Sequence, residues 1–418
     1  MFKLLRIPQA ISTVIGELEM FFTLHQWVHF QTMLLSLLIT PFKATVVGRS
    51  RVLAFGTHRT KHNEFLQHSD ELLGKALRFY AMKLIALLEQ AQEVLYVIID
   101  DSKTAKRGKH VQAAFRLFDH TTQRFLWGHQ FVCVTLLYRG MIIPYAIELY
   151  RSKDDCRNRQ LPFRKLTQIA EDLITTLPDF GVRRVYVLAD TYYASKQIIR
   201  TVRAKGFHFI SFLKTNRRLT IGNRSTSISK LLRRSFSKTR KHWISLAPTS
   251  RGRYATVQQK CHLPGIGDIS VVFSQKKGRR TVLPLFTTDS TLATKDILSN
   301  YRKRWSIEVL FKHTKQYLGL TAYHHRDEKA VRTHLQLVML AYALLTHLFL
   351  AEQRAQGKNL TQKLLASFSV RESQQRIRAL VAVDTLDCIE DRIPKRWLPT
   401  QHYKEQIIEH VKSYLLAA

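Results

Sequence analysis

The spacing of hydrophobic residues changes along the chain and separates helical stretches from strand-rich ones. Over residues 1–90 the apolar positions recur every three or four residues, most regularly from Leu72 to Leu88, which predicts helices. Residues 94–99 form a short apolar run rich in branched side chains, which predicts a buried strand ending at Asp100-Asp101. The basic residues 103–109 that follow predict a loop.

The next part of the chain predicts an α/β sheet. Residues 126–138 and 141–150 are expected to be strands joined in a hairpin at Arg139-Gly140. Strands joined by helical crossovers predict a mixed sheet with helices on both faces, and open α/β sheets place functional side chains at the carboxyl ends of strands. The remaining expected elements are a helix at 166–177, a strand at 185–189 ending at Asp190, a helix at 193–205 closed by Gly206, and a strand at 207–213.

Residues 215–293 are basic and again rich in strand patterns, at 254–261, 269–274 and 281–287, which predicts an inserted β subdomain. From Asp296 the chain is expected to be mostly helical. The predicted organisation begins with a helical region at 1–90, which either binds DNA or serves packing. A core at 91–214 and 294–350 follows and is interrupted by the insertion at 215–293. The last part is a helical region at 351–418, in which residues 403–416 are a candidate for dimerisation.

Composition narrows the class of partner. The 418 residues include 66 Lys and Arg against 31 Asp and Glu, a net charge of +35, while 45% hydrophobic residues are ample for a packed core. Such a charge favours a long polyanion, DNA or RNA. The apolar stretches 27–40 and 335–351 contain polar residues and are near or below the roughly 20 residues of a membrane span, so both are expected to be buried helices.

The four cysteines do not have zinc-site spacing, which favours a reduced compartment, the cytoplasm, with Cys133 in the core.

One segment carries an unusual combination of side chains. Tyr301, Arg304, Glu308 and Lys315 follow the spacing Y-x2-R-x3-E-x6-K, which on a continuous helix returns to one face. Glu308 is an acid among bases, as a metal-binding carboxylate at a polyanion site would be. Considered alone, Glu308 could equally pair with Lys312 four residues later.

Two acids upstream complete a candidate metal site with Glu308. They are Asp101, or its neighbour Asp100, and Asp190, which alone could also cap the following helix. Three such carboxylates can hold two Mg²⁺ ions about 4 Å apart, one activating a water or 3′-hydroxyl and the other stabilising the leaving oxygen of a phosphoryl transfer. Tyr301 and Trp305 could be simple core aromatics.

The combination resembles the bacterial insertion-sequence transposases of the cut-and-paste kind, which carry a DDE triad and a YREK signature. The four spaced residues at 301–315, Asp-Asp-Ser at 100–102 and Val-Leu-Ala-Asp at 187–190 carry the resemblance, which covers roughly residues 90–350. It implies a ribonuclease H-like core and two Mg²⁺ ions, with Mn²⁺ as a substitute. By position the catalytic metal ligands would be Asp101, Asp190 and Glu308, with Asp101 preferred because Ser102 follows it.

The resemblance also implies DNA contacts and partners. Tyr301, Arg304 and Lys315 would contact phosphates near the cut. Relatives may stack a flipped base on an aromatic of the insertion, but residues 282–286 contain no Trp; Phe286 is either that residue or, as we expect, core. Trp305 is expected to serve packing. Further DNA contacts are expected from the basic segments at Lys103, Lys106, Arg107, Lys109, Arg217, Arg218, Arg233 and Arg234.

The sequence hypothesis is therefore a transposase that cleaves transposon ends and joins the 3′-hydroxyls to target DNA. Its expected partners are double-stranded DNA, as ends and target, and a second copy in a homodimer on DNA, at the bacterial nucleoid rather than a membrane. The alternatives are a related nuclease that cuts without joining and a catalytically silent DNA-binding repressor or scaffold.

Overall fold

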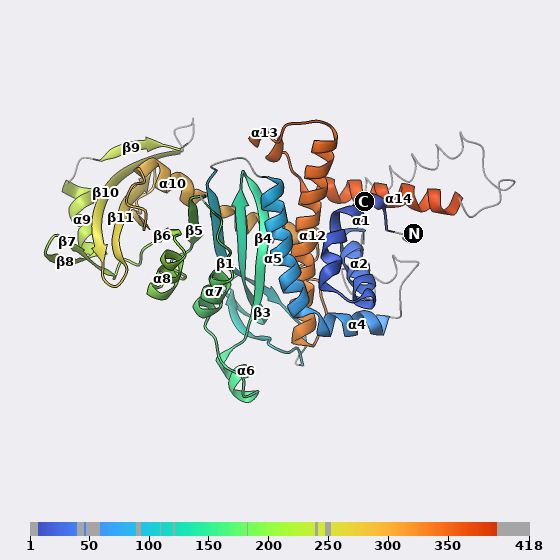
Figure 1. Cartoon of the computed structure of the whole chain (residues 1–418). Helices are drawn as coiled ribbons and strands as arrows, with labels where there is room; N and C mark the ends of the chain where they lie inside the picture. The colour runs from blue at the N-terminus through green and yellow to red at the C-terminus, as the bar shows by residue number, and fades with distance from the viewer. Residues whose placement is uncertain are drawn as a thin grey trace.

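A mixed sheet runs through the protein and is covered by helices (Figure 1). The computed structural model describes residues 7–39, 46, 59–88, 93–108, 110–119, 122–181, 183–238, 241–246 and 252–390. Within them the sheet has 12 strands in the order β2-β3-β1-β5-β6-β12-β11-β10-β7-β8, with β4 also paired to β3 and β9 to β10. The α/β class predicted from the sequence is confirmed.

The strands have the following bounds: β1 Leu95–Ala105, β2 Phe115–Asp119, β3 Arg124–Tyr138, β4 Met141–Tyr150, β5 Val185–Ala189, β6 His208–Phe212, β7 Arg218–Ile221, β8 Arg224–Ser227, β9 His242–Ser245, β10 Arg253–Leu263, β11 Gly267–Lys276 and β12 Leu283–Thr287. The helices are α1 Gln9–Ile15, η1 Gly16–Phe21, α2 Leu24–Ile39, α4 Arg59–His68, α5 Asp70–Leu87, α6 Lys153–Asn158, α7 Leu166–Thr175, α8 Lys196–Ala204, α9 Ile228–Lys238, α10 Thr294–Arg302, α11 Trp305–Tyr317, α12 Glu328–Ala355, α13 Gln362–Leu365 and α14 Val370–Glu390.

Strand β1 lies at the centre of the α/β part of the sheet. It pairs antiparallel with β3 and parallel with β5, and its residues 95–99 are buried, as the apolar run predicts. The prediction that it ends at Asp100-Asp101 is wrong, because the ladder with β3 continues to Ala105 opposite Gly128. Both acids therefore lie within a strand, and part of the predicted basic loop is strand.

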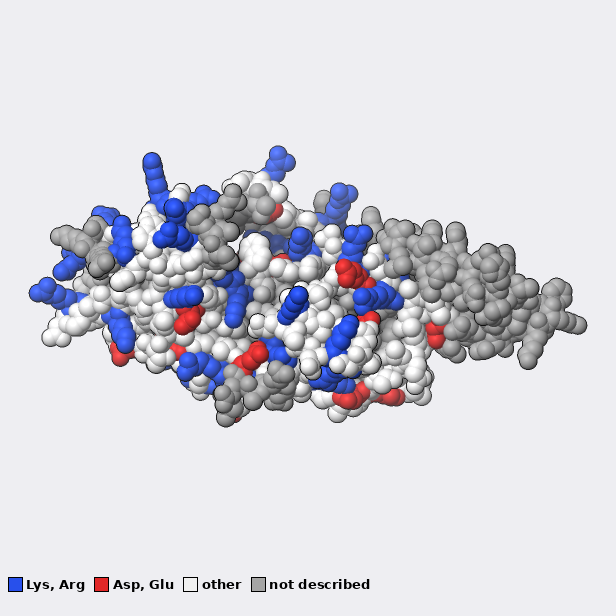
Figure 2. All heavy atoms as spheres, turned by 90° about the horizontal axis from the view of Figure 1, so that it is seen from above, with Lys and Arg blue, Asp and Glu red and all other residues white. Residues whose placement is uncertain are grey.

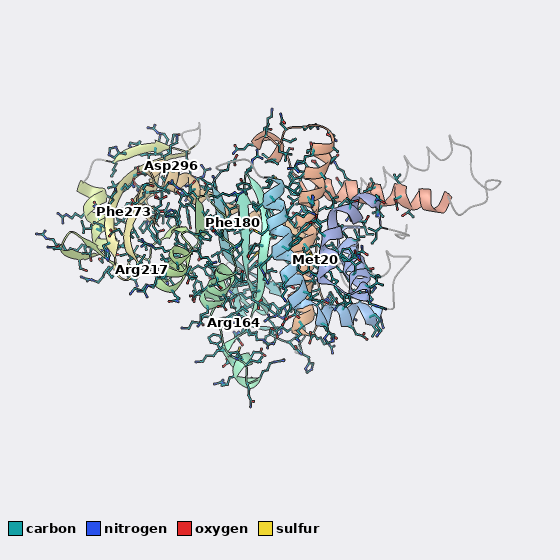
Figure 3. The ribbon with its side chains drawn as sticks, in the orientation of Figure 1. Met20, Arg164, Phe180, Arg217, Phe273 and Asp296 are labelled. Atoms are coloured by element: carbon teal, nitrogen blue, oxygen red, sulfur yellow. The ribbon has the colours of Figure 1, made fainter. Side chains whose placement is uncertain are left out.

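The strand-rich segment after β6 continues the same sheet. β12 pairs antiparallel with β6, and β11, β10 and β7 follow in order. The three strands predicted in this segment are present as β10, β11 and β12, whereas the short strands β7, β8 and β9 were not predicted. Phe273 lies among these curved strands, and Met20 lies in the helical layer at the other end of the molecule (Figure 3).

Basic side chains are spread over much of the face seen in Figure 2, including the strand-rich end.

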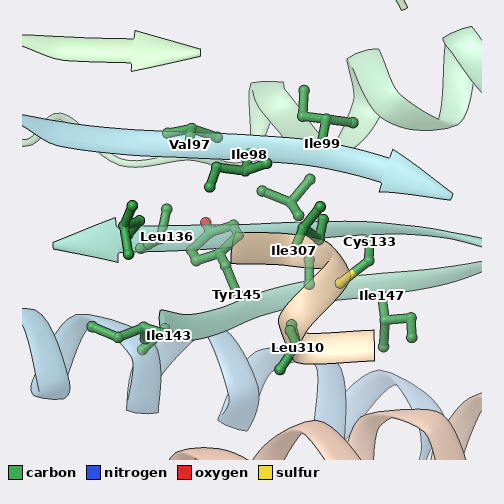
Figure 4. Packing of buried hydrophobic residues seen from close by; sticks show 14 of the residues in the cluster. Val97, Ile98, Ile99, Cys133, Leu136, Ile143, Tyr145, Ile147, Ile307 and Leu310 are labelled. Carbon is green, nitrogen blue, oxygen red and sulfur yellow. The ribbon is translucent and has the colours of Figure 1, made fainter. Parts of the chain in front are cut away.

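Helices cover the two faces of the α/β part of the sheet differently. α7 and α8 pack together in front of the sheet in Figure 1, while α10 and α11 contact it from behind. Ile307 and Leu310 of α11 are fully buried and lie near Cys133 and Ile147 of β3 and β4 (Figure 4). This packing seats α11 on β3 and β4, and α11 also contacts β1, the strand that carries Asp100.

The predicted single helix through the Y-x2-R-x3-E-x6-K segment is interrupted. α10 ends at Arg302 and α11 begins at Trp305, with turn hydrogen bonds from the N–H of Lys303 to Asn300 O and from that of Arg304 to Tyr301 O. Tyr301 and Glu308 therefore belong to different helices, and the expected continuous helical stripe is wrong in this respect.

Helix α12 contains the second apolar stretch of the sequence. It is long and apolar enough to cross a membrane, the one such helix among the described residues, and 89% of its most apolar segment is buried inside the structure. α2 covers most of the first stretch and buries Phe30, Met33 and Leu37. Both stretches are buried helices, as expected from the sequence.

Three buried histidines predict an acid-sensitive fold. Burial lowers the pKa of His62, His129 and His347 to about 4, against about 6.5 in an unfolded chain. The unfolded state thus binds more protons as the pH falls from about 6.5 to about 4, so the free energy of unfolding should fall, by up to ~3 kcal/mol per histidine. Urea denaturation across this range measures the loss.

The substitution His347→Gln, at the residue bonded to Tyr80 Oη at 2.8 Å, should make that slope shallower. His324→Gln, which replaces an exposed histidine, is the matched control and should leave the slope unchanged. An equal slope in the wild type and His347→Gln would contradict the assignment.

Candidate active site

A single arginine joins two of the acidic segments. Arg304 donates from one terminal nitrogen to Asp100 Oδ2 at 2.8 Å and from the other to Glu308 Oε1 at 2.5 Å. Asp100 is on β1, Arg304 immediately precedes α11, and Glu308 lies in the first turn of that helix. The side chains of Asp100 and Arg304 are 18% and 19% exposed, so this ion pair is largely shielded from water. Glu308 pairs with Arg304, and not with Lys312 as its sequence neighbourhood allowed.

The second acid, Asp190, lies beside Asp100 on the neighbouring strand. Ile99 pairs with Ala189 in the parallel ladder of β1 and β5, so the next residues, Asp100 and Asp190, leave the ladder side by side. Asp190 Oδ1 accepts hydrogen bonds from the backbone N–H groups of Tyr192 and Tyr193 at 2.9 and 3.3 Å. Its Oδ1 therefore caps the turn after β5, whereas the following helix α8 is capped by Ser195, so Asp190 is not the cap of that helix.

Asp101 points away from Arg304. Its Oδ1 accepts from Tyr193 Oη at 2.9 Å and its Oδ2 from Gln130 Nε2 at 2.6 Å. Successive side chains of a strand alternate between faces, so Asp100 faces α11 and Asp101 faces the start of α8. Of the two candidates, Asp100 is the one brought together with Glu308.

Tyr301 and Lys315 flank the cluster. The Tyr301 ring packs edge to face on Phe212, with centroids 4.7 Å apart. Lys315 Nζ donates to Ser102 Oγ at 2.7 Å, two residues beyond Asp100 on the same face of β1. The interrupted helices thus still bring Tyr301, Arg304, Glu308 and Lys315 to one side of the sheet.

Burial and neighbouring carboxylates both shift the pKa values of the acids in the cluster. Burial raises the pKa of Asp100 to about 7, against Arg304, which lowers it, and the charges of Asp101 and Asp190 raise it further. Burial also raises the pKa of Asp190, with a contribution from Asp101. Burial raises the pKa of Tyr301 to about 12, and the nearby Asp190 and Asp100 act in the same direction.

The donor chemistry fits a hard divalent cation. Asp100, Asp190 and Glu308 offer carboxylate oxygens, the ligands that Mg²⁺ prefers. The charges of Asp101 and Asp190 act against ionisation of Asp100, and a bound cation would relieve this repulsion. As the side chains stand, no three Asp, Glu, His or Cys residues in the described part of the chain are grouped to hold a metal ion. Arg304 instead bridges Asp100 and Glu308, so metal binding requires these carboxylates to rearrange.

The basic residues predicted as DNA contacts fall into two groups. Lys106 Nζ donates to the carbonyls of Thr321 and Tyr323, both at 2.9 Å, and burial lowers its pKa to about 7. Lys103 donates to Phe118 O and Arg217, beside α8 (Figure 3), to Ala194 O. These three side chains are therefore engaged within the fold, and their assignment to DNA contacts stays a prediction. The others described are exposed: Arg107, Arg218, Arg233 and Arg234; Lys109 lies outside the described residues.

Two aromatic predictions have opposite outcomes. Phe286 is fully buried beside Phe209, which confirms it as a core residue. Trp305 is 62% exposed, so its expected packing role is wrong. Sequence reasoning also missed Gln130 and Tyr193, which hold Asp101; Tyr193 follows Asp190 closely in sequence, but no local pattern marks Gln130 on the adjacent strand.

Comparison with known proteins identifies the family. A model described as "DDE superfamily endonuclease" matches residues 19–259, and one described as "Archaeal putative transposase ISC1217" matches residues 258–352. A Sinorhizobium fredii protein named "Putative transposase y4zB" is 36% identical over 70 residues, which are 17% of this chain and 20% of that protein. That match spans about a fifth of the relative's length. Because the first match covers more than half of the chain, the protein belongs to the DDE superfamily of endonucleases.

Proposed function

We propose that the protein is an insertion-sequence transposase that cleaves transposon ends and joins the freed 3′-hydroxyls to target DNA. DDE endonucleases generally use a divalent metal ion, and transposase families bind DNA. The observation that carries the proposal is the convergence of Asp100, Asp190 and Glu308 beside Arg304 in a chain of net charge +35. The Y-x2-R-x3-E-x6-K spacing supports the bacterial insertion-sequence type, and the β-rich segment before α10 supports an interrupted ribonuclease H-like core.

The proposed metal ligands are Asp100, Asp190 and Glu308. Asp100 replaces Asp101 in this role because it shares a face of the sheet with Glu308, whereas Asp101 is held by Tyr193 and Gln130. Two Mg²⁺ ions bound there, or Mn²⁺ in their place, would favour deprotonation of the attacking water or 3′-hydroxyl and stabilise the leaving oxygen.

The basic neighbours position the DNA. Arg304 is paired with Asp100 and Glu308 in this structure, and with these carboxylates engaged by a cation its planar guanidinium would be available to hold a phosphate with two parallel donors. Lys315 supplies a compact charge beside Ser102 for an adjacent phosphate. Tyr301 is held by Phe212 at the same edge, where its hydroxyl reaches a backbone oxygen of the DNA.

One site serves both reactions, because hydrolysis and strand transfer are the same displacement at phosphorus with different nucleophiles. Both ends of an element must be cut and joined together, so we propose a homodimer assembled on double-stranded DNA at the bacterial nucleoid. Residues 403–416, a candidate for this assembly, lie outside the described residues.

The central test is cleavage and strand transfer of the element's own end DNA, taken from the inverted repeats that flank its gene. Asp100→Asn, Asp190→Asn and Glu308→Gln should each lower the cleavage rate about a hundredfold or more, since each removes a charge that stabilises the transition state through the metal. Activity should vanish in EDTA and return with Mg²⁺ or Mn²⁺. Strand-transfer products exclude a nuclease that only cuts, and cleavage excludes a silent repressor or scaffold.

Asp101→Asn is the matched control for Asp100→Asn, one residue away on the opposite face. It should keep cleavage within about tenfold of the wild type, because Asp101 positions Tyr193 and Gln130 and is no metal ligand in this proposal. The reverse pattern, an inactive Asp101→Asn beside an active Asp100→Asn, would assign the first ligand to Asp101.

The bridging role of Arg304 predicts energetic coupling in the metal-free protein. A double-mutant cycle of Arg304→Ala with Asp100→Asn should give about 1–3 kcal/mol of interaction in urea denaturation, because a shielded charged hydrogen bond is lost. The same cycle between Lys312→Ala and Glu308→Gln is the control and should give close to zero. An interaction energy between Lys312 and Glu308, without one between Arg304 and Asp100, would refute the bridge.

Loss of the Lys315 charge should weaken binding of end DNA. Lys315→Ala is expected to reduce the salt dependence of log K by about one ion, because one phosphate contact is lost. Filter binding or fluorescence anisotropy over a salt series in EDTA measures the slope. Lys363→Ala, an exposed lysine on α13, serves as the control and should leave it unchanged. Identical slopes for Lys315→Ala and the wild type would remove this role.

A further inference from the structure

A stripe of aromatic and basic side chains lies on the β2–β3 hairpin, outside the acidic cluster. The register pairs Arg116 with Trp127 and Phe118 with Phe125, and directly opposite residues of an antiparallel pair share a face. The Phe118 and Phe125 rings meet edge to face with centroids 5.2 Å apart, and the Arg116 guanidinium lies 4.1 Å from the centroid of Phe125. We call these four residues the hairpin stripe.

The stripe exposes large rings to solvent. Phe125 is 58% and Trp127 42% exposed, and the indole N–H of Trp127 donates to Gly108 O at 3.1 Å, which fixes the ring in place. Arg116 is exposed, as are Arg107 and Arg124 nearby in the chain. Exposed aromatic rings among guanidinium groups suit a ligand with flat faces and negative charge, which nucleic acid provides.

The hairpin stripe continues the face of the sheet that carries the acidic cluster. Along β3, alternate side chains share a face: Cys133 lies opposite Asp100, the Phe131 ring meets Phe311 of α11, and His129 contacts Tyr323 beyond α11. Trp127 is the next residue in this series. Six residues of strand separate Cys133 from Trp127, or roughly 20 Å, the length of about six base pairs of DNA.

We propose that the hairpin stripe binds DNA bases that are unpaired about six nucleotides from the scissile phosphate. The inference rests on the proposed function, since the acidic cluster defines where the cut lies. Stacking on aromatic rings holds bases without sequence preference, while Arg116 and its basic neighbours hold the backbone. α11 and Tyr323 cover the buried residues Phe131 and His129 between the two sites, so DNA bound at the cluster and at Lys315 would pass over this layer to reach the hairpin.

The test compares fully paired end DNA of the element with end DNA that contains five unpaired nucleotides. The unpaired stretch begins about six nucleotides from the cut and is placed on one side of the cut in one substrate and on the other side in a second. Binding is measured by anisotropy in EDTA. The wild type should bind one of the unpaired forms more tightly than the paired form, and the double variant Phe125→Ala, Trp127→Ala should lose about tenfold in affinity for that form. A 2-aminopurine in the unpaired stretch should be quenched by the wild type alone.

Conservative replacement by Phe125→Tyr with Trp127→Phe keeps both rings and should retain the preference. Leu24→Ala, at an apolar residue of α2 that is 71% exposed, is the control for a general loss of exposed surface. Circular dichroism and thermal melting confirm that each variant is folded, and Phe125→Ser alone repeats the test if the double variant does not fold.

Three outcomes overturn the inference: equal binding of paired and unpaired DNA by the wild type, no loss in the variant, or equal losses on both DNA forms, which would indicate a duplex contact. A change in oligomeric state in the variant, with unchanged DNA binding, would assign the stripe to a second copy of the chain instead. An end duplex too short to reach the hairpin stripe tests the proposed function separately from the inference about the stripe. Its cleavage by the variant at the wild-type rate leaves the proposed function intact, whereas failure of the wild type to cleave it refutes that function.

Discussion

An acidic side chain on the buried central strand of the sheet is the constraint on which the candidate site depends. Asp100 continues a run of apolar residues, and burial raises its pKa to about 7 despite the ion pair with Arg304. The charge of Arg304 acts against this rise in pKa, and Arg304 reaches Asp100 because α11 is seated on β3 and β4 through Ile307 and Leu310. The packing of one helix therefore determines whether this ion pair forms.

The sequence predicted which helices and strands make up this arrangement better than it predicted where each of them begins and ends. The apolar run of β1 stops at Ile99, but the strand continues to Ala105 because β3 satisfies its backbone through residues as distant as Gly128. The break at Lys303-Arg304 has no proline or glycine to mark it, and the helical offsets therefore predicted one continuous face. Whether Asp100 or Asp101 faces Glu308 depends on which side of the sheet α11 covers, and a local pattern does not contain that information.

The strand-rich segment illustrates a further limit. Its main strands follow from their apolar runs, but the pairing of β12 with β6, which makes the segment a continuation of the core sheet, links residues more than 70 positions apart in sequence. Short strands were missed for a different reason. Phe115–Asp119 has only five positions and lacks strict alternation of apolar and polar residues, and without β3 as its partner such a segment is marginal as a strand.

Net charge overstates how much of the surface is available to DNA. Lys103, Lys106 and Arg217 each donate to backbone carbonyls of other segments, so each has donors that are occupied within the fold. Burial in this position also lowers the pKa of Lys106 to about 7. The guanidinium of Arg304 is also occupied, because it is shared between two carboxylates that would otherwise repel each other. Composition can therefore identify a nucleic-acid-binding class, but the cations that face the DNA follow only from the internal acceptors that each side chain meets in the fold.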